Sequence, residues 1–414
     1  MYDWANSSYN LVITSTLFPI YFNGVTRSFF DSEVVLFFGF EIVNTVLYSY
    51  SVSVSFLIAA CLSPLLSGIA DYGGKKKLFL KVFTYLGSSS TVALFWFTGD
   101  NVEYGIIFSV LAGVGYSGSL VFYNSFLPDI TSKANYDKLS ARGYSFGYIG
   151  SVLLLLISFV LIEFHAVFGF ESETVMVRLS FLMVGVWWFG FAQYSFYHLP
   201  NGERRGADQN LFAKGVKELK LVYQSLHGLK SMKRYLTSFF FYSMGVQTVM
   251  FLAATFGEKE LRLETVKLIV TITLIQLVAI PGAYGFARLS KIYNNGVSIL
   301  TMLVLWIVVC LYAYFLQTEY QFYGLAILVG LIMGGIQSMS RSTFSKLIPD
   351  NSIDNTSYFS FYDVTEKLAI VIGTFSFGFI EYVTGSMRNS TLALMIYFLI
   401  GIVFLLYSKI HKDK

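Results

Sequence analysis

Long apolar stretches recur along the whole chain, and short polar or charged segments separate them. A run of about 18 or more apolar residues can cross the roughly 30 Å hydrocarbon core of a bilayer as a helix, at 1.5 Å per residue. The pattern contains twelve such runs and therefore predicts twelve transmembrane helices. Their approximate cores are residues 5–22, 47–70, 78–98, 104–127, 143–162, 175–198, 235–256, 267–287, 297–316, 321–345, 358–382 and 390–408.

One part of this pattern has the alternation of a half-buried strand. From Tyr48 to Ser55, larger residues alternate with serine. The alternation continues into an unbroken apolar run that is far longer than the roughly ten residues of a membrane-spanning β-strand. The segment is therefore predicted to be helical.

The longest polar interval, residues 199–233, divides the predicted helices six and six. Within it, apolar residues recur at three- and four-residue spacing against lysines, which is typical of an amphipathic helix. The apolar positions are Phe212, Val216, Leu219, Tyr223, Leu226 and Leu229, and the lysines are Lys214, Lys217 and Lys220. Such a helix lies either on the inner leaflet or packed on the bundle as a solvated linker. We expect a first bundle over 1–199, a linker over 200–233 and a second bundle over 234–414.

Prolines and glycines indicate an internal repeat. Pro64 lies 217 residues before Pro281, and Gly113 lies 221 residues before Gly334. The members of each pair fall in the same place in their halves, the second and the fourth predicted helix. Two parallel six-helix repeats are a standard plan of secondary transporters. The expected fold is therefore an all-α membrane protein with two pseudo-symmetric six-helix bundles and the substrate between them.

Composition and charge agree with this fold class. Hydrophobic residues make up 55% of the chain and charged residues 13%, and the net charge of +4 is spread over short loops without a basic face for nucleic acid. If residue 1 is cytoplasmic, 22 of the 29 lysines and arginines fall on the cytoplasmic side. The excess of positive charge in cytoplasmic loops then predicts that both termini are cytoplasmic.

Between the second and third predicted helices, residues 67–78 read SGIADYGGKKKL. This segment resembles the corresponding loop of the major facilitator superfamily, with the signature G-x-x-x-D-R-x-G-R-[RK], although Tyr72 replaces the arginine. The resemblance implies a cytoplasmic gate in which Asp71 accepts hydrogen bonds from the start of the eleventh helix, while the lysines stay in the headgroup layer. A lysine cluster that only sets topology is the alternative. The candidate gate residues are Asp71, Gly74, Lys75, Lys76, Asp129 and Arg142.

Four further segments, residues 2–9 (YDWANSSY), 242–249, 337–349 and 359–367, resemble the vacuolar amino-acid effluxer family linked to autophagy in fungi, which has bacterial members. The resemblance covers essentially the whole chain. It implies a proton-driven transporter of amino acids or similar small polar metabolites, with export favoured, in a bacterial cytoplasmic membrane. Met244 replaces an acid that many relatives carry. Relatives usually have a few polar residues before DWANS, so the natural chain is expected to begin earlier.

The eleventh predicted helix holds three charged residues, Asp363, Glu366 and Lys367. A charge in the membrane costs about 3 kcal/mol on insertion scales, so such residues mark transport pathways. Asp363 and Lys367 are four residues apart on one helix face, which predicts either a structural ion pair or a site of substrate or ion coupling. Arg341 on the tenth helix either completes a charge network with them or lies near the inner interface. In a network, protonation of Asp363 or Glu366 would free a cation for a substrate carboxylate.

Uncharged polar residues within the spans complete the candidate site. Each either bonds a neighbouring helix or contacts the solute, and as a set they favour a polar substrate. They are Asn6, Tyr9, Asn124, Tyr242, Gln247, Gln276 and Gln337. Asp3 is predicted to cap the first helix at its positive end.

Other chemistry finds little support. The spacing of histidines and cysteines does not suit a metal site, and the sequence contains no Walker loop for ATP. The GxGxxG match at 113–118 lies within a predicted helix, so close helix packing is the better interpretation. The same interpretation applies to Gly143 and Gly147. Cys61 and Cys310 are predicted to pack within spans. We expect no cofactor, no metal, no enzymatic activity and a monomer, with a small polar substrate, protons and the lipid bilayer as partners. The alternatives are a sugar or organic-anion carrier, a transport-dead membrane receptor or an intramembrane enzyme.

Overall fold

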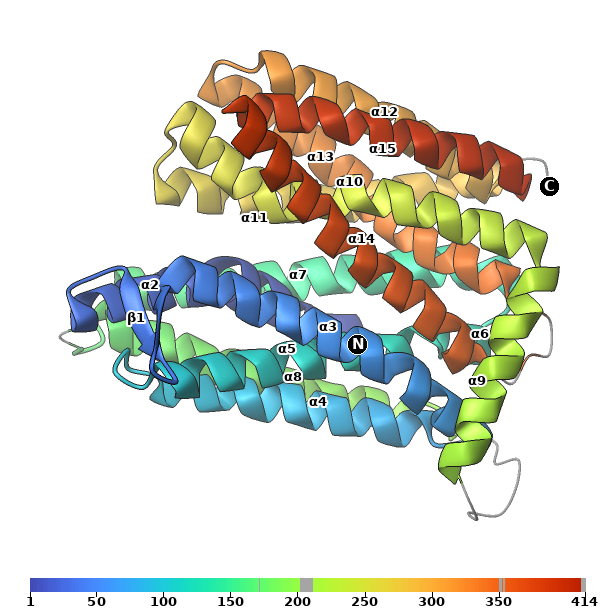
Figure 1. Cartoon of the computed structure of the whole chain (residues 1–414), viewed down its shortest axis with the longest axis horizontal. Coiled ribbons are helices and arrows are strands. Elements are labelled where there is room, and N and C mark those ends of the chain that lie inside the picture. The colour runs from blue at the N-terminus through green and yellow to red at the C-terminus, as the bar shows by residue number, and fades with distance from the viewer. Residues whose placement is uncertain (171, 202–210, 350–351, 353, 411–414) are drawn as a thin grey trace. The chain divides into compact units, whose positions relative to one another are not determined.

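The computed structural model describes residues 1–170, 172–201, 211–349, 352 and 354–410. The chain forms two compact units of helices (Figure 1). Unit 1 comprises Met1–Tyr123 and Phe146–Gln209, and unit 2 comprises Asn124–Ser145 and Asn210–Lys414. Unit 2 thus includes residues 124–145, which lie before the bundle boundary that the sequence pattern predicts. The predicted linker residues 202–210 and the tail residues 411–414 lie outside the described residues.

The first predicted span is one unbroken helical segment with a π-helix at its centre. It consists of α1 (Tyr2–Ser8), the π-helix η1 (Tyr9–Leu17) and α2 (Phe18–Phe30). In the π-register, the carbonyl of Thr14 would accept from residue 19, but Pro19 has no N–H. The hydroxyl of Tyr48 donates to this carbonyl instead, at 2.6 Å. The segment therefore stays helical although one backbone hydrogen bond is missing.

A β-hairpin follows α2, which departs from the all-α expectation. Strands β1 (Val34–Phe37) and β2 (Phe40–Val43) pair antiparallel around Phe38 and Gly39. Both turn residues have left-handed backbone conformations, with φ of +47° and +84°, as a two-residue hairpin turn requires. The sequence pattern predicts no element here, because each strand has only four residues.

The remaining helices of unit 1 pack closely through small residues. They are α3 (Asn44–Gly73), α4 (Lys76–Ala93) with the 3-10 turn η2 (Leu94–Trp96), α5 (Val102–Asn124), the later part of α7 (Tyr136–Glu163) and α8 (Glu173–His198). Residues 48–55 lie in α3, so the prediction of a helix there is confirmed. Gly115 of α5 lies against the backbone of Gly87 in α4, and Gly147 of α7 lies against Ser7 in α1. Helix packing is therefore the correct interpretation of these glycines.

We expect Gly115→Ala to destabilise the protein by about 1–3 kcal/mol, the usual cost of overpacking. The added methyl group would overlap the backbone of Gly87, which cannot move without separating α4 from α5. Gly190→Ala in α8 is the control, because a methyl group there meets no atom within 4 Å. Thermal unfolding in detergent, followed by size-exclusion chromatography, measures the difference. Equal melting temperatures for the two variants would contradict this packing.

Unit 2 contains the second set of membrane helices and three short or amphipathic elements. They are α6 (Leu127–Ile130), the 3-10 turn η3 (Lys133–Asn135), α9 (Leu211–Gly228), α10 (Lys230–Leu261), α11 (Thr265–Ile292), α12 (Asn295–Phe315), α13 (Glu319–Leu347), α14 (Asn355–Thr384) and α15 (Met387–Ser408). Gly334 of α13 lies against the backbone of Ala279 in α11, as Gly113 of α5 lies against Ser55 in α3. The sequence repeat thus corresponds to one recurring contact, between the fourth and second membrane helices of each half.

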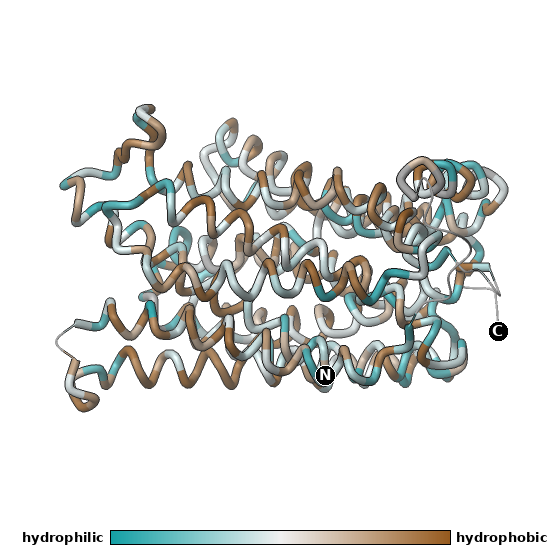
Figure 2. Tube along the Cα trace, turned by 90° about the horizontal axis from the view of Figure 1, so that it is seen from below, coloured by the Kyte–Doolittle hydropathy of each residue, from teal (hydrophilic) through white to brown (hydrophobic). Residues whose placement is uncertain are grey.

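The twelve predicted spans are all present as helical segments. Eleven helices within the described residues are long and apolar enough to cross a membrane. The first segment is not in this set, because η1 divides it into three shorter pieces and because it contains a larger share of polar residues than the other spans. Figure 2 shows hydrophobic residues along the lengths of the helices.

The described part of α9 packs on α14 within unit 2. The Ser225 hydroxyl lies 2.9 Å from the Tyr358 hydroxyl, and the rings of Tyr223 and Phe361 are 6.0 Å apart. Val222 is buried. This packing corresponds to the interpretation of a linker helix held on the bundle. The side chains of Phe212, Lys214 and Leu226 lie outside the described residues.

Candidate functional site

The charged residues of α14 form a compact buried group in unit 2. Asp363 and Lys367, one turn apart, form an ion pair, and both side chains are 6% exposed. Glu366 between them is half-buried and accepts a hydrogen bond of 2.8 Å from the Gln247 amide of α10. The group contains two carboxyl side chains and one amine in the middle of a membrane helix. With both carboxyl groups ionised it carries one excess negative charge, and one bound proton makes it neutral.

A chain of hydroxyl groups lies on α10 and α13 in the same unit. The Tyr242 hydroxyl is 2.7 Å from that of Ser340 and 3.2 Å from that of Tyr235. Tyr235 also donates to the Ser340 carbonyl at 3.0 Å. The Gln337 amide donates to the sulfur of Met250, a weak acceptor, at 3.2 Å. Tyr242, Gln247 and Gln337, all predicted site residues, thus lie in one unit with the charges of α14.

Arg341 of α13 is buried, and several neutral groups accept its hydrogen bonds. Its guanidinium donates to the hydroxyl and carbonyl of Ser140 at 2.9 and 3.0 Å, and to Asn124 Oδ1 at 3.3 Å. It also lies 4.4 Å from the centre of the Tyr144 ring, a cation–π contact. The structure therefore brings together the predicted residues Arg341 and Asn124. The predicted network of Arg341 with Asp363 remains a prediction.

The sequence pattern does not reveal a second ionic cluster of unit 2, which is centred on Asp137 of α7. This carboxylate is 3% exposed and accepts from Lys346 at 2.6 Å, from Asn295 at 2.8 Å and from Ser290 at 3.0 Å. The Asn295 amide also donates to Thr343 at 2.9 Å. The partners come from α11, α12 and α13. No local spacing signals the cluster, because Asp137 and Lys346 are 209 residues apart in sequence.

Two further predicted gate residues lie in unit 2. Asp129 of α6 accepts a hydrogen bond of 2.9 Å from Asn355, the first residue of α14. Next to it, the hydroxyl groups of Thr356 and Ser125 are 3.2 Å apart. Asp129 is thereby connected to the helix that carries the charged group. Arg142 of α7 is exposed.

In unit 1, the predicted site residue Tyr9 is the first residue of the π-helix, and Asn6 lies in α1 just before it. Asn6 is 1% exposed, and neither side-chain polar atom has a hydrogen-bond partner among the described residues. A buried unsatisfied polar group costs about 1–3 kcal/mol, and such groups often occur where a solute or water binds. Tyr9 lines a pocket of about 20 Å³ together with Asn10, Thr14 and Tyr48. The sequence pattern does not single out these last three residues.

The loop that resembles the superfamily gate has the expected turn. Asp71 is buried in the last turn of α3, and Gly74 caps this helix with a φ of +63°, a conformation that favours glycine. Lys76 is 8% exposed, so protein covers it, and the position of the lysines in the headgroup layer remains a prediction. Lys77 donates to the carbonyl of Leu199 at 2.8 Å, because the carbonyl groups at the end of α8 attract a cation. The gate itself remains a prediction.

Asp3 and the two cysteines can be compared with their predictions. Asp3 lies in the first turn of α1, so this acid is near the positive end of the helix as predicted. Its carboxylate also accepts a hydrogen bond from Tyr123 and so joins α1 to α5. Cys310 is buried as predicted, whereas Cys61 is exposed.

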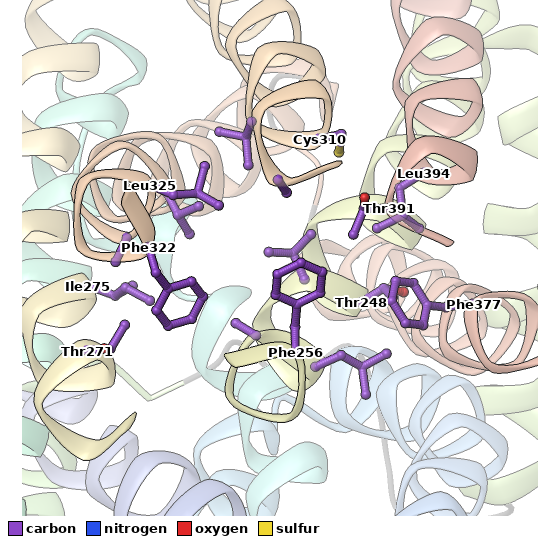
Figure 3. A pocket seen from close by; sticks show the side chains of 17 residues that line it. Thr248, Phe256, Thr271, Ile275, Cys310, Phe322, Leu325, Phe377, Thr391 and Leu394 are labelled. Atoms are coloured by element: carbon purple, nitrogen blue, oxygen red, sulfur yellow. The ribbon is translucent and has the colours of Figure 1, made fainter. Parts of the chain in front are cut away.

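A second cavity lies among α10–α15 of unit 2, with a volume of about 60 Å³ (Figure 3). Its wall is almost entirely apolar, and Phe256, Phe322 and Leu394 are among the residues that line it. A polar solute would lose its hydrogen bonds with water there without replacing them. The polar group of α14 is therefore a better candidate for a solute site. Within the described residues, no three histidine, cysteine, aspartate or glutamate side chains are placed to hold a metal ion.

Comparisons with known proteins agree on one family and one fold. The whole chain, residues 1–414, matches the family described as vacuole effluxer Atg22 like. It is 30% identical to the uncharacterized MFS-type transporter YxiO of Bacillus subtilis (strain 168), over 98% of this chain and 93% of that protein. Autophagy-related protein 22-1 of Aspergillus niger is 24% identical, over 92% of this chain and 75% of its own. The solved proton:xylose symporter XylE has a similar fold, with a TM-score of 0.72 and 14% identity over 98% of this chain and 93% of its own.

Proposed function

The chain belongs to the vacuole effluxer Atg22-like family of major facilitator transporters, and from this premise we propose that it exports a small polar solute, in the first place an amino acid, in exchange for protons. It is a multi-pass integral membrane protein, and its fold and family are those of transporters. The proposed orientation has both termini in the cytoplasm of a bacterium, as the positions of the basic residues predict.

The observation that carries this proposal is the buried charged group of α14. An amino acid presents one carboxylate and one ammonium, and a buried Lys367 ammonium suits the carboxylate. The ionised acidic side chains of the group suit the solute ammonium in turn. A proton on the acid that holds the ammonium would remove its charge and release the solute, and loss of the proton would let the solute bind again, so proton and solute compete for the site as exchange requires.

The direction of transport is part of the proposal. The family description names effluxers of the vacuole, which gives no direction across a bacterial membrane, and we propose export from the cytoplasm. The Asp129 to Asn355 hydrogen bond at the start of α14 and the Asp71 turn at the end of α3 are the proposed parts of the cytoplasmic gate. Each would open and close as α14 changes its state of protonation.

Transport into proteoliposomes under an imposed pH gradient tests the proposal. One pH unit is worth about 1.4 kcal/mol, so exchange of one proton per solute predicts roughly tenfold accumulation. Labelled amino acids, sugars and organic anions form the panel. Accumulation of an amino acid supports the proposal. If only a sugar or an organic anion accumulates, the proposed substrate class is wrong. If no solute moves, the proposal of transport is contradicted.

Glu366→Gln separates coupling from solute movement. The substitution removes a proton site but retains a side chain that can bond Gln247. We expect solute exchange across the membrane without a gradient to continue, while the roughly tenfold accumulation in a gradient of one pH unit disappears. Unchanged accumulation by this variant would exclude Glu366 as the coupling group and leave Asp363 to be tested in the same way.

A further inference from the structure

The β-hairpin of unit 1 presents an unusually apolar outer face. Side chains alternate between the two faces of a strand, and in the observed pairing Val34 lies opposite Val43 and Leu36 opposite Glu41. Val35, on the other face, is buried at 1% exposed. Val34, Leu36 and Val43 are instead 40%, 50% and 36% exposed. The face turned away from the helices is therefore made mostly of aliphatic side chains.

The tip of the hairpin is aromatic. Phe38 is 65% exposed and Phe40 is 76% exposed. Phe38 has a φ of +47°, a conformation that is unfavourable for a bulky residue and that glycine or asparagine adopts more easily. The turn itself thus gains nothing from an aromatic side chain at this position. Its position is nevertheless fixed, because the Phe38 N–H donates to Glu103 Oε1 at 2.8 Å.

The hairpin lies where the membrane helices meet the headgroup layer. It connects α2, which ends at Phe30, with α3, which begins at Asn44. The 30 residues of α3 extend about 45 Å, which matches the roughly 40–45 Å of a bilayer with its headgroup layers. In Figure 1 the strands cross the ends of the unit 1 helices instead of continuing along them. When α3 crosses the bilayer, strands placed in this way lie at headgroup depth.

We propose that this hairpin is an interfacial anchor, which inserts Phe38 and Phe40, the exposed aromatic side chains of its tip, into the boundary between headgroups and acyl chains at its end of unit 1. In the proposed orientation this boundary belongs to the outer leaflet. Aromatic and aliphatic side chains are stabilised at this depth. In water the same surface would be a site of aggregation. The anchor would fix the outer end of the segment that contains the π-helix, and it does not depend on which solute is transported.

The charges around the hairpin indicate which lipids suit it. Asp31, Glu33 and Glu41 lie in or beside it, and Arg27 pairs with Glu33 at 2.7 Å. The remaining charge is negative, so anionic headgroups would be repelled. The expected partner is a leaflet of zwitterionic lipid. Pairing with the hairpin of a second copy is a poorer fit, because each strand offers an edge of only four residues.

A spin label on the tip tests the anchor. Cys61→Ser and Cys310→Ala remove the native thiols, and Phe40→Cys then carries the label in vesicles of phosphatidylcholine. Asp100→Cys is the control, because this exposed residue lies in the loop between η2 and α5, at the same end of unit 1. We expect the label at 40 to collide mainly with oxygen, which concentrates in lipid, and the label at 100 to collide mainly with a water-soluble nickel complex.

A second variant, Phe38→Asn, tests the anchor in a hairpin that is expected to fold as in the parent protein. Asparagine suits the left-handed turn, so the hairpin should remain intact while it loses one of its inserted side chains. We expect the label at 40 to become more accessible to the nickel complex in this variant. Equal accessibility of the labels at 40 and 100 in the parent protein would overturn the proposal. Strong spin–spin coupling between labels at position 40 would also overturn the proposal if it falls when the protein is diluted in lipid, because it would indicate a second copy as the partner.

Discussion

Lys367→Met is expected to reduce solute transport at least about 30-fold, because removing one member of a buried charge pair costs about 2–5 kcal/mol. The proposed solute carboxylate loses its cation, and Asp363 retains a charge with 6% of its side chain exposed. Initial rates in proteoliposomes, normalised to the amount of folded protein, measure the effect. Lys220→Met is the matched control, because Lys220 is exposed on α9 and its removal leaves no buried charge. Equal rates for the two variants would remove Lys367 from the mechanism.

Lys346→Met is expected to have the largest effect on stability. It leaves the Asp137 carboxylate, which has 5% of its side chain exposed, without its cation, and a broken buried pair costs about 3–5 kcal/mol. The melting temperature in detergent should fall well below that of Lys291→Met, which removes an exposed lysine near the end of α11. Asp137→Asn combined with Lys346→Met should recover most of the loss, because no unpaired charge remains. A double variant as unstable as the single one would contradict this explanation.

Much of the fold follows from features that act locally in the sequence. The apolar runs predict all twelve helical segments, and eleven of these helices in the described residues are long and apolar enough to cross a membrane. The pairing of Asp363 with Lys367 is predictable because residues four apart share a helix face. The repeat between Gly113 and Gly334 marks a real helix contact because both positions need a residue without a side chain.

Other features depend on contacts that no local pattern contains. Asp137 and Lys346 meet only when distant helices pack, so neither residue differs in sequence from an ordinary loop charge. The hairpin is too short for a reliable alternation. The π-helix has one local sign, Pro19, which removes a backbone donor, but the group that replaces it comes from Tyr48 of α3. Lys76 looks like a solvated lysine in a basic run, whereas the fold buries it.

These differences affect how the site is interpreted. The polar groups expected in one cavity lie in two units, with charged residues in unit 2 and the unsatisfied amide of Asn6 in unit 1. Arg341 donates hydrogen bonds to Asn124 and Ser140, and the ion pair of Asp363 and Lys367 lies within α14 itself. The proposed mechanism therefore requires that the pair of Asp363 and Lys367 takes part in transport and does not only stabilise α14.

The most direct test of this claim is transport by the neutral double variant Asp363→Asn/Lys367→Met. It removes both members of the ion pair, so neither leaves an unpaired partner, and the protein should fold with a melting temperature close to that of the parent. If the pair operates in transport, the folded double variant should move solute no faster than Lys367→Met alone. Transport at the rate of the parent protein would show that the pair only stabilises the helix and would contradict the account.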